Sequence, residues 1–393
     1  MSWITGIGLT SFGRHPGRQT LDLMSEAAQA ALLDARLERR EVDGLLTGYS
    51  TTFPHLMLAT VFAEHFGLRP TYAHALQVGG ATGFAMVMLA HHLVDSGAAQ
   101  RVLVVAGENR LTGQSRDAAV QALAQVGHPD YEVPLGATIP AYYGLVASRW
   151  IHERALAAGS KAPGEDDSLH WQRELAELAV LMRRHAAGHP GAQFRDPVGV
   201  EDVMASKAVA SPLKLLDCCP VSDGAAAFVV SRSRGDGHAV RIAGTGQAHT
   251  HQHISAAPSL VHYGAAESMA RAAAAAGFGP RHCHYAAVYD SFTITLAILL
   301  EELGLAPAGG AGRCAREGEF SAGGRLPLNT HGGLLSYGHC GVGGAMAHLA
   351  EAHLQLTGRA GARQCGQPGK AVLHGDGGVL SSHVSLLLAR EEA

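Results

Sequence analysis

The sequence of 393 residues has few charged and few aromatic side chains, and each shortage excludes a class of protein. Charged residues make up 16% of the chain and aromatic residues 6%, whereas hydrophobic residues make up 47%. That balance excludes a disordered or fibrous chain and is typical of a large buried α/β core. Lysine and arginine number 30 against 34 acidic residues, a formal net charge of −4. Because there is no basic excess, we do not expect binding to nucleic acid.

Cysteine is also scarce, since the chain has six and none of them forms a Cys-x-x-Cys pair. Neither a zinc ribbon nor a disulfide framework is therefore predicted, which favours a reducing compartment. The N-terminus lacks the basic stretch and apolar core of a signal peptide. No apolar run reaches the roughly 18 residues that are needed to cross a bilayer. We expect a cytoplasmic protein without a membrane span.

One order of strand, helix and strand occurs twice in the chain. The first copy covers residues 4–8, 21–35 and 42–46, and the second covers residues 242–246, 267–277 and 286–290. Short apolar runs that alternate with helices of ten or more residues predict parallel strands joined by crossover helices. Two β-α-β-α-β halves of this kind, each too small to cover its own helix face, are expected to pack together as one body.

A second pattern is repeated more clearly. A glycine-rich turn opens a helix at residues 80–93 and again at 341–354, and each helix is followed by a strand that ends in glycine, at 102–107 and 371–375. A turn and a buried strand at residues 222–230 complete the first half. The repeats indicate that the chain is built from two similar halves.

The predicted domains are a first half, residues 1–235, and a second half, residues 236–393. The first half contains an inserted loop region at about 110–215, which is rich in histidine, arginine and proline. We predict helices at residues 140–157 and 168–187 within it. An insertion of this length in a compact α/β body is usually functional, for example as a lid or as a cover over an acyl chain.

Ligands of open α/β sheets bind at the carboxyl ends of the strands, where glycine-led turns open helices. Four segments fit that description: residues 77–83, 289–292, 329–344 and 374–379. The third is the richest in glycine, with six in sixteen residues, which lets backbone N–H groups approach a ligand closely. His339 and Cys340 directly precede a predicted helix, and the helix dipole and the adjacent imidazole are expected to lower the pKa of the thiol.

The sequence from Asn329 to the predicted helix reads Asn-x-x-Gly-Gly, then Gly-His at residues 338–339, then a glycine-rich helix start. This pattern resembles the C-terminal signature of the thiolase superfamily, in its sterol-carrier-protein-type (lipid-transfer) branch. Further landmarks of that branch occur in order along the chain: residues 128–132, 189–192, 222–226 and 289–292. The resemblance implies an α/β thiolase fold, in which two duplicated halves form five α-β-α-β-α layers.

The sequence departs from the family pattern at the positions where the family has its catalytic residues. Ordinary thiolases carry a nucleophilic cysteine in a Cys-Ala-Ser-Gly turn at a helix N-terminus, where it accepts the acyl group. The matching turn begins here with Gly80, which has no side chain and cannot form an acyl-enzyme. The family's second cysteine is absent near residues 374–378, where His374 could exchange protons instead. Tyr289 replaces the Asn or His of the family's Asn-Glu-Ala-Phe segment.

His339 is the family element that the sequence retains, and it implies an oxyanion site for the thioester carbonyl. Cys340 stands where the family has proline, and it is either a replacement acyl acceptor or a small apolar residue that fills space. Tyr289 is either a proton donor, as in relatives that act as retro-aldolases, or a core aromatic residue. The candidate catalytic residues are His339, Cys340, Tyr289 and His374, and the candidate oxyanion or substrate-binding residues are Asn329, His331, Gly332, Gly333, Gly80 and Gly343.

These observations predict a thiolase-like enzyme that forms or cleaves a C–C bond in acyl-CoA thioesters, by acyl transfer of the Claisen type. One alternative is an aldolase of 3-hydroxyacyl-CoA that forms no covalent intermediate. Another is a non-catalytic acyl-CoA-binding subunit with a small zinc-ribbon/OB-fold partner, because many relatives have one.

The resemblance also implies what the chain binds. A coenzyme A thioester is the expected substrate, and neither a tightly bound cofactor nor a metal is implied. A homodimer is expected through strands of the first half, and the apolar run at residues 102–105 is expected to be buried there.

Overall fold

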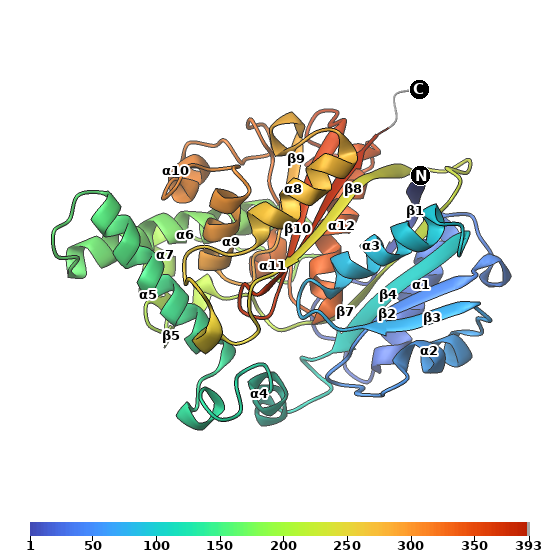
Figure 1. Cartoon of the computed structure of the whole chain (residues 1–393), viewed down its shortest axis with the longest axis horizontal. Helices are drawn as coiled ribbons and strands as arrows, with labels where there is room; N and C mark the ends of the chain where they lie inside the picture. The colour runs from blue at the N-terminus through green and yellow to red at the C-terminus, as the bar shows by residue number, and fades with distance from the viewer. Residues whose placement is uncertain (391–393) are drawn as a thin grey trace.

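A nine-stranded sheet runs through the computed structural model, which describes residues 1–390 (Figure 1). In order across the sheet the strands are β3 (Tyr72–Leu76), β2 (Gly44–Gly48), β4 (Arg101–Asn109), β7 (Asp223–Ser231), β1 (Ser2–Leu9), β8 (Val240–His249), β11 (Ser382–Ala389), β10 (Lys370–Gly377) and β9 (Tyr285–Val288). β1 pairs antiparallel with β8 through residues 2–4. This contact joins the first five strands, here called the first half of the sheet, to the other four, the second half.

Both halves of the sheet are built in the same way, but their strands are not all parallel. In the first half β7 runs antiparallel between β4 and β1, and in the second half β11 runs antiparallel between β10 and β8. The prediction of parallel strands holds for β2 with β3 and β4, and for β9 with β10. It is wrong for β7 and β11, because the chain re-enters the sheet at the end where the preceding strand left it.

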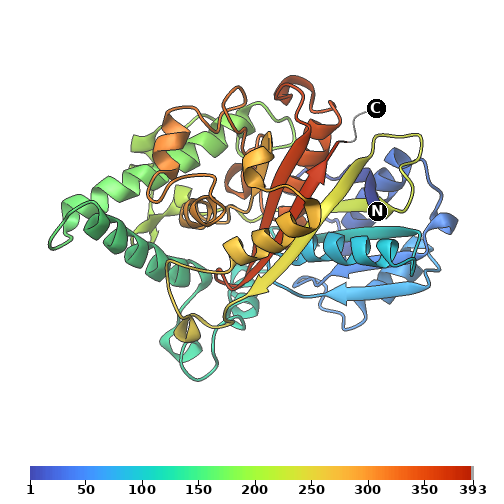
Figure 2. The ribbon, with the colours of Figure 1, turned by 45° about the horizontal axis from the view of Figure 1, so that its top comes forward.

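Helices divide the structure into layers (Figures 1 and 2). The covering helices are α1 (Thr20–Asp34), α2 (Leu58–Phe66), α3 (Thr82–Asp95), α8 (Ala265–Ala276), α9 (Thr293–Glu302) and α12 (Val342–Leu356). α3 and α12 contact each other and strands of both halves of the sheet, so these two helices form the layer between the two halves. α1 and α2 cover the outer face of the first half, and α8 covers that of the second. The predicted α-β-α-β-α thiolase fold is confirmed by this arrangement.

The inserted region between β4 and β7 packs on helices that belong to the second half of the chain (Figure 2). It contains α4 (Arg116–Ala124), α5 (Ile139–Ala157), α6 (Glu165–Ala187), α7 (Val200–Ala205), β5 (Ala208–Ala210) and β6 (Leu213–Lys214). The predicted helices at 140–157 and 168–187 are therefore present as α5 and α6. α6 packs on α9, α10 (Ala311–Arg316) and α11 (Gly333–Ser336), which places the insertion beside the glycine-rich loop at 329–344.

Glycines on the first strand of each half allow a helix to pack directly on the backbone. A methyl group at Gly8 of β1 would lie less than 3.0 Å from the carbonyl oxygen of Ala27 in α1. A methyl group at Gly246 of β8 would lie equally close to the carbonyl oxygen of Ser268 in α8. The repeated Gly-x-Gly of the sequence is therefore a packing requirement that the two halves share.

The apolar run at residues 102–105 lies on β4, inside the sheet between β2 and β7. Its burial therefore needs no second subunit, which corrects the reason that the sequence offered for a dimer. The outer strand of the first half is β3, whose side chains are half-buried or exposed. Among residues 1–390, no helix has both the length and the apolar character that crossing a membrane requires.

We expect Gly8→Ala and Gly246→Ala each to lower the free energy of unfolding by about 1–3 kcal/mol, because the added methyl group overlaps a helix carbonyl. Urea unfolding of the full chain measures the change. Gly323→Ala is the control, since a methyl group there would have none of the described residues within 4 Å. Unchanged unfolding midpoints in both strand variants would contradict this packing.

Candidate active site

Tyr289 and His339 meet where the second half of the sheet ends and α12 begins. Tyr289 directly follows β9, and His339 lies three residues before α12. The Tyr289 hydroxyl is 3.1 Å from Nε2 of His339, and the two rings are perpendicular, with centroids 6.2 Å apart. Tyr289 is buried and His339 is partly exposed. Two of the four predicted catalytic side chains are therefore in direct contact.

The hydrogen bonds around His339 define its protonation. The backbone N–H of Gly341 donates to Nδ1 of His339 (3.2 Å), so the neutral ring carries its proton on Nε2 and donates it to the Tyr289 hydroxyl. Burial and the neighbouring Arg110 guanidinium lower the pKa of His339 to about 3. Burial raises the pKa of Tyr289 well above its usual value of 10. The His339 imidazole and the Tyr289 phenol are therefore both uncharged at neutral pH. Because Tyr289 accepts the hydrogen bond from His339, it can donate its own hydroxyl hydrogen to another acceptor.

Gly80 makes room for this hydroxyl. A methyl group on Gly80 would lie less than 3.0 Å from the Tyr289 hydroxyl oxygen and 2.5 Å from the carbonyl oxygen of Asp376. Gly80 stands in the turn before α3, where the family pattern has its nucleophilic cysteine. The Tyr289 hydroxyl therefore lies where the side chain of residue 80 would begin, and a cysteine cannot share this space with it.

Two charged residues at the end of β4 border the site, and the sequence reasoning did not find them. Glu108 is buried and accepts hydrogen bonds from the backbone N–H (2.7 Å) and hydroxyl (2.5 Å) of Thr51. A methyl group on Gly341 would overlap its carboxylate. Arg110 has a buried Nε that finds no hydrogen-bond partner in the part of the chain that the structure describes, and its charge opposes protonation of His339. Their position at the carboxyl end of a strand was the available signal.

Cys340 lies outside the Tyr289–His339 pair. Its fully buried thiol belongs to an apolar cluster with Phe12, Ala186, Ala192, Tyr337 and Ala347. Burial raises the pKa of this thiol well above its usual value, which corrects the expectation that the helix start would lower it. Gly343 allows α12 to pack closely on β4, because a methyl group on it would lie 2.9 Å from the carbonyl oxygen of Ala106 and 3.0 Å from the sulfur of Cys340.

His374 supports Tyr289 through its main chain. Its carbonyl oxygen accepts a hydrogen bond from the backbone N–H of Tyr289 (3.0 Å). Its imidazole is fully buried, with Nδ1 2.9 Å from the hydroxyl of Ser385 and Nε2 3.1 Å from Nδ1 of His383, both on β11. Burial lowers the pKa of His374 well below 6.5. The structure thus brings the His374 backbone, and not its imidazole, to the pair.

Asn329 holds the end of β9 in place. Its amide accepts a hydrogen bond from the backbone N–H of Val288 (2.9 Å) and donates one to the carbonyl of the same residue (2.7 Å). Asn329 is fully buried and has a positive φ of 46°, a conformation that asparagine tolerates better than most residues. Its side chain therefore acts on the main chain next to Tyr289.

Gly333 leaves space for a buried carboxylate, whereas Gly332 leaves space for Ala186 of α6. Both have positive φ, 107° and 60°, and a methyl group on Gly333 would overlap the carboxylate of Asp290. Asp290 accepts hydrogen bonds from the backbone N–H of Leu334 (2.7 Å) and from Nε2 of His348 in α12 (3.0 Å). These contacts tie β9, α11 and α12 together beside Tyr289. Within residues 1–390, no group of three or more His, Cys, Asp or Glu side chains is placed to hold a metal ion.

Comparison with known proteins agrees with this architecture. The family model "Thiolase, N-terminal domain" matches residues 3–234, and "Thiolase C-terminal domain-like" matches residues 246–390. The chain therefore belongs to the thiolase superfamily. Within it, the chain lies in the sterol-carrier-protein-type branch, as the motifs predict.

Three relatives illustrate the chemistry found in this superfamily. The chain is 32% identical to the steroid side-chain-cleaving aldolase of Thermomonospora curvata, over 84% of this chain and 85% of the relative. It is 28% identical to an acetyl-CoA acetyltransferase of Methanothermobacter thermautotrophicus, over 97% and 98% of the two chains. The solved structure named Ltp2-ChsH2(DUF35) aldolase is 30% identical with a TM-score of 0.82, and the match covers 99% of this chain and 97% of that one.

Because burial and Arg110 hold the pKa of His339 at about 3, we expect its imidazole to stay neutral, with the proton on Nε2, from pH 8 to pH 5. Imidazole ¹⁵N spectra measure this, and the signal is assigned by its loss in His339→Gln. Arg110→Gln should move the titration to higher pH, because a positive charge that opposes protonation is removed. A midpoint above pH 5 in the unmodified chain, or a proton on Nδ1, would contradict the geometry.

Proposed function

We propose that this chain cleaves or forms the C2–C3 bond of a coenzyme A thioester by an aldol reaction, without a covalent acyl-enzyme. The observation that carries the proposal is the position of the Tyr289 hydroxyl, which is bonded to His339 and fills the space next to Gly80. The name of the Thermomonospora curvata relative, a steroid side-chain-cleaving aldolase, supports the same reaction class.

The geometry favours this reaction over acyl transfer. Acyl transfer of the thiolase type needs a thiolate that attacks the thioester carbonyl. Gly80 offers no side chain, and the Cys340 thiol is enclosed in an apolar cluster that raises its pKa. A buried thiol with a raised pKa is a poor nucleophile.

In the cleavage direction, the substrate is a 3-hydroxyacyl-CoA. The hydroxyl on C3 loses its proton, the C2–C3 bond breaks, and its electron pair moves onto C2 and the thioester oxygen. The products are an aldehyde or ketone and the enolate of a shortened acyl-CoA. C2 then takes up a proton, so the reaction consumes no net proton and needs no oxidant or reductant.

Tyr289 stabilises the charge that develops on the thioester oxygen. Because burial raises its pKa, the phenol stays protonated and can donate its free hydrogen to the enolate oxygen. The N–H of His339 donates to the same hydroxyl, which polarises the phenol and strengthens it as a donor. His339 thus acts on the substrate through Tyr289, and neither group needs to change its charge.

A second copy of this chain covers the free edge of β3 in the proposed assembly. An unpaired edge strand presents backbone groups that a second strand can bond. Beside it, the segment before α2 exposes Leu56 (97%) and Met57 (60%), and α2 packs on β3. Exposed apolar side chains next to a free sheet edge are typical of a subunit interface.

A small zinc-ribbon/OB-fold protein is a further proposed partner, and the name Ltp2-ChsH2(DUF35) aldolase, which joins two components, supports it. The proposed substrate is a coenzyme A thioester, with no tightly bound cofactor. Turnover of 3-hydroxyacyl-CoA by the isolated chain would show that the partner is not needed for chemistry, and would remove the alternative of a non-catalytic subunit.

We expect Tyr289→Phe to lower kcat for cleavage of 3-hydroxyacyl-CoA by about 10²–10³-fold, which is the usual loss when one oxyanion donor is removed. Release of aldehyde or ketone is measured, with unfolding followed in parallel to verify the fold. Tyr263→Phe is the matched control, because the buried Tyr263 hydroxyl has no hydrogen-bond partner in residues 1–390. Equal rates in Tyr289→Phe and the unmodified chain would exclude the proposed role.

Light scattering tests the proposed dimer. We expect a mass of twice 40.9 kDa for the chain and a single 40.9 kDa subunit for the variant Leu56→Asp with Met57→Asp, because two charges then face the apolar contact. Leu169→Asp, an exposed position on α6, should leave the dimer intact. A monomeric unmodified chain would show that β3 is not an interface.

A further inference from the structure

A cavity lies outside the Tyr289–His339 pair, along α12. Its volume is about 360 Å³, and it is bounded by the segment after β1, the loop after α6 and the glycine-rich loop at 329–344. α12 contributes Ala347, Ala350, Glu351 and Leu354, which lie on one face of the helix because they are three or four residues apart. Leu9 adds to the apolar wall. Nothing in the proposed reaction uses this cavity.

One buried imidazole group, that of His331, lines the cavity. His331 is 2% exposed, and neither of its ring nitrogens has a hydrogen-bond partner among the described residues. Its ring centroid lies 4.7 Å from that of His348, whose Nδ1 also lacks a partner within residues 1–390, and 5.3 Å from that of Tyr337. A buried polar atom without a partner costs about 1–3 kcal/mol, so native proteins rarely keep one. A polar group that enters the cavity would supply a hydrogen-bond partner for a ring nitrogen of His331.

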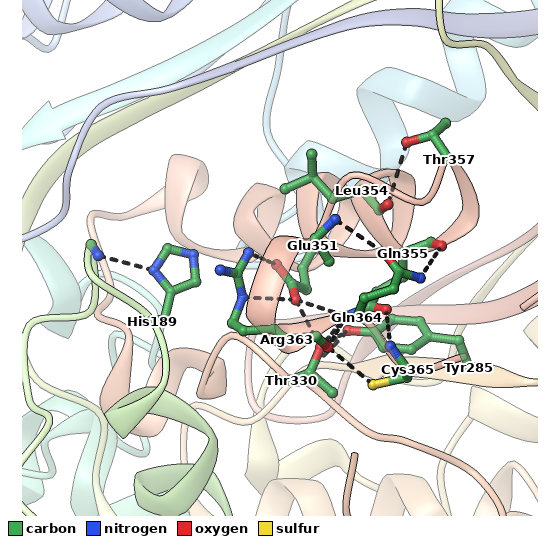
Figure 3. A network of polar contacts seen from close by, with 12 residues as sticks. His189, Tyr285, Thr330, Glu351, Leu354, Gln355, Thr357, Arg363, Gln364 and Cys365 are labelled. Carbon is green, nitrogen blue, oxygen red and sulfur yellow. Dashed lines mark hydrogen bonds and ion pairs between the residues drawn. The ribbon is translucent and has the colours of Figure 1, made fainter. Parts of the chain in front are cut away.

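Hydrogen-bond donors face the same space. Nδ1 of His189 accepts from the backbone N–H of Gly191 (3.0 Å), so the neutral ring carries its proton on Nε2. Figure 3 shows the His189 ring turned toward the guanidinium of Arg363. Arg363 uses Nε (3.1 Å) and Nη2 (2.9 Å) on the carboxylate of Glu351, which leaves Nη1 without a bond to the described residues. His189 and Arg363, which both line the cavity, thus each have an N–H group, on Nε2 and on Nη1, that is available to a ligand.

The acidic side chain that lines the cavity, Glu351, already has hydrogen-bond donors from the protein. Glu351 is 2% exposed and accepts hydrogen bonds from Thr330 (2.8 Å), Gln355 (3.1 Å) and Arg363 (Figure 3). Its negative charge is therefore compensated and does not repel an anion. What remains available is a set of N–H donors at one end and an apolar wall along α12.

We propose that this cavity is a second binding site, for a small carboxylate carried on an apolar body. The carboxylate would lie between His189 and Arg363, within reach of His331, and the apolar body would lie along Ala350 and Leu354. Cavities of roughly 300 Å³ or more are large enough for a small organic ligand. The site does not depend on the proposed function, because it uses none of the residues assigned to the aldol reaction.

The glycine-rich loop at 329–344 serves both places. His331 and Tyr337 face the cavity, whereas His339 contacts Tyr289. Asp290 and His348, joined by a hydrogen bond of 3.0 Å, lie between them. The cavity is thus separate from the catalytic pair, but it is built from the same segment of chain.

Hexanoate, 1-hexanol and hexylamine are the probes, titrated into the full chain by calorimetry and by imidazole ¹⁵N spectra. We expect hexanoate to bind saturably and to shift the signals of His189 and His331, which are assigned by their loss in His189→Leu and His331→Gln. The alcohol and the amine should bind at least tenfold more weakly, because neither offers an anionic acceptor.

Two variants test the location. His189→Leu removes a donor and Ala350→Leu fills the cavity, and each should weaken hexanoate binding at least tenfold. His152→Leu, an exposed histidine on α5, is the matched control and should not change it. Hexanol binding as tight as hexanoate binding, or hexanoate binding without shifts of His189 and His331, would overturn the proposal. The ligand comparison uses the unmodified chain, so it remains decisive even if a variant fails to fold.

Discussion

The turn before α3 has space for one of two groups: a side chain on residue 80, or the hydroxyl of Tyr289. The chain has the second, and neighbouring elements hold it there. The carbonyl of His374 fixes the backbone of Tyr289, and the amide of Asn329 closes the end of β9 just before it. The loss of the nucleophile and the presence of the tyrosine are therefore one structural change, because a methyl group on Gly80 alone would displace the hydroxyl.

Burial decides the chemistry that this arrangement permits. The pKa of His339 is lowered and that of Tyr289 is raised, so both groups are uncharged hydrogen-bonding partners over the physiological range. The Arg110 guanidinium acts in the same direction, since its charge opposes protonation of His339. Uncharged donors that are already oriented stabilise a developing enolate without reorganising, whereas a thiolate mechanism needs an ionised nucleophile. The site therefore suits aldol chemistry on a thioester.

Local patterns in the sequence predicted most of the fold. Helices α5 and α6 and the repeated strands follow from periodicity and glycine positions, but the antiparallel strands β7 and β11 do not, because strand pairing is decided by distant segments. Tyr289, His339 and Gly80 were found through motifs. The environment of Cys340 could not be predicted, since its cluster includes Phe12 from the far end of the chain. Arg110 carries no motif at all and is found only from its place after β4. The predicted domain division near residue 235 stays a prediction.

The central claim is that C–C bond cleavage occurs without an acyl group on the protein. Intact-mass measurement of the chain, quenched by acid during steady turnover of 3-hydroxyacyl-CoA, tests it most directly. The account predicts that the protein keeps its unmodified mass while product accumulates. A population whose mass is higher by one acyl group, formed and lost at the rate of turnover, would contradict it.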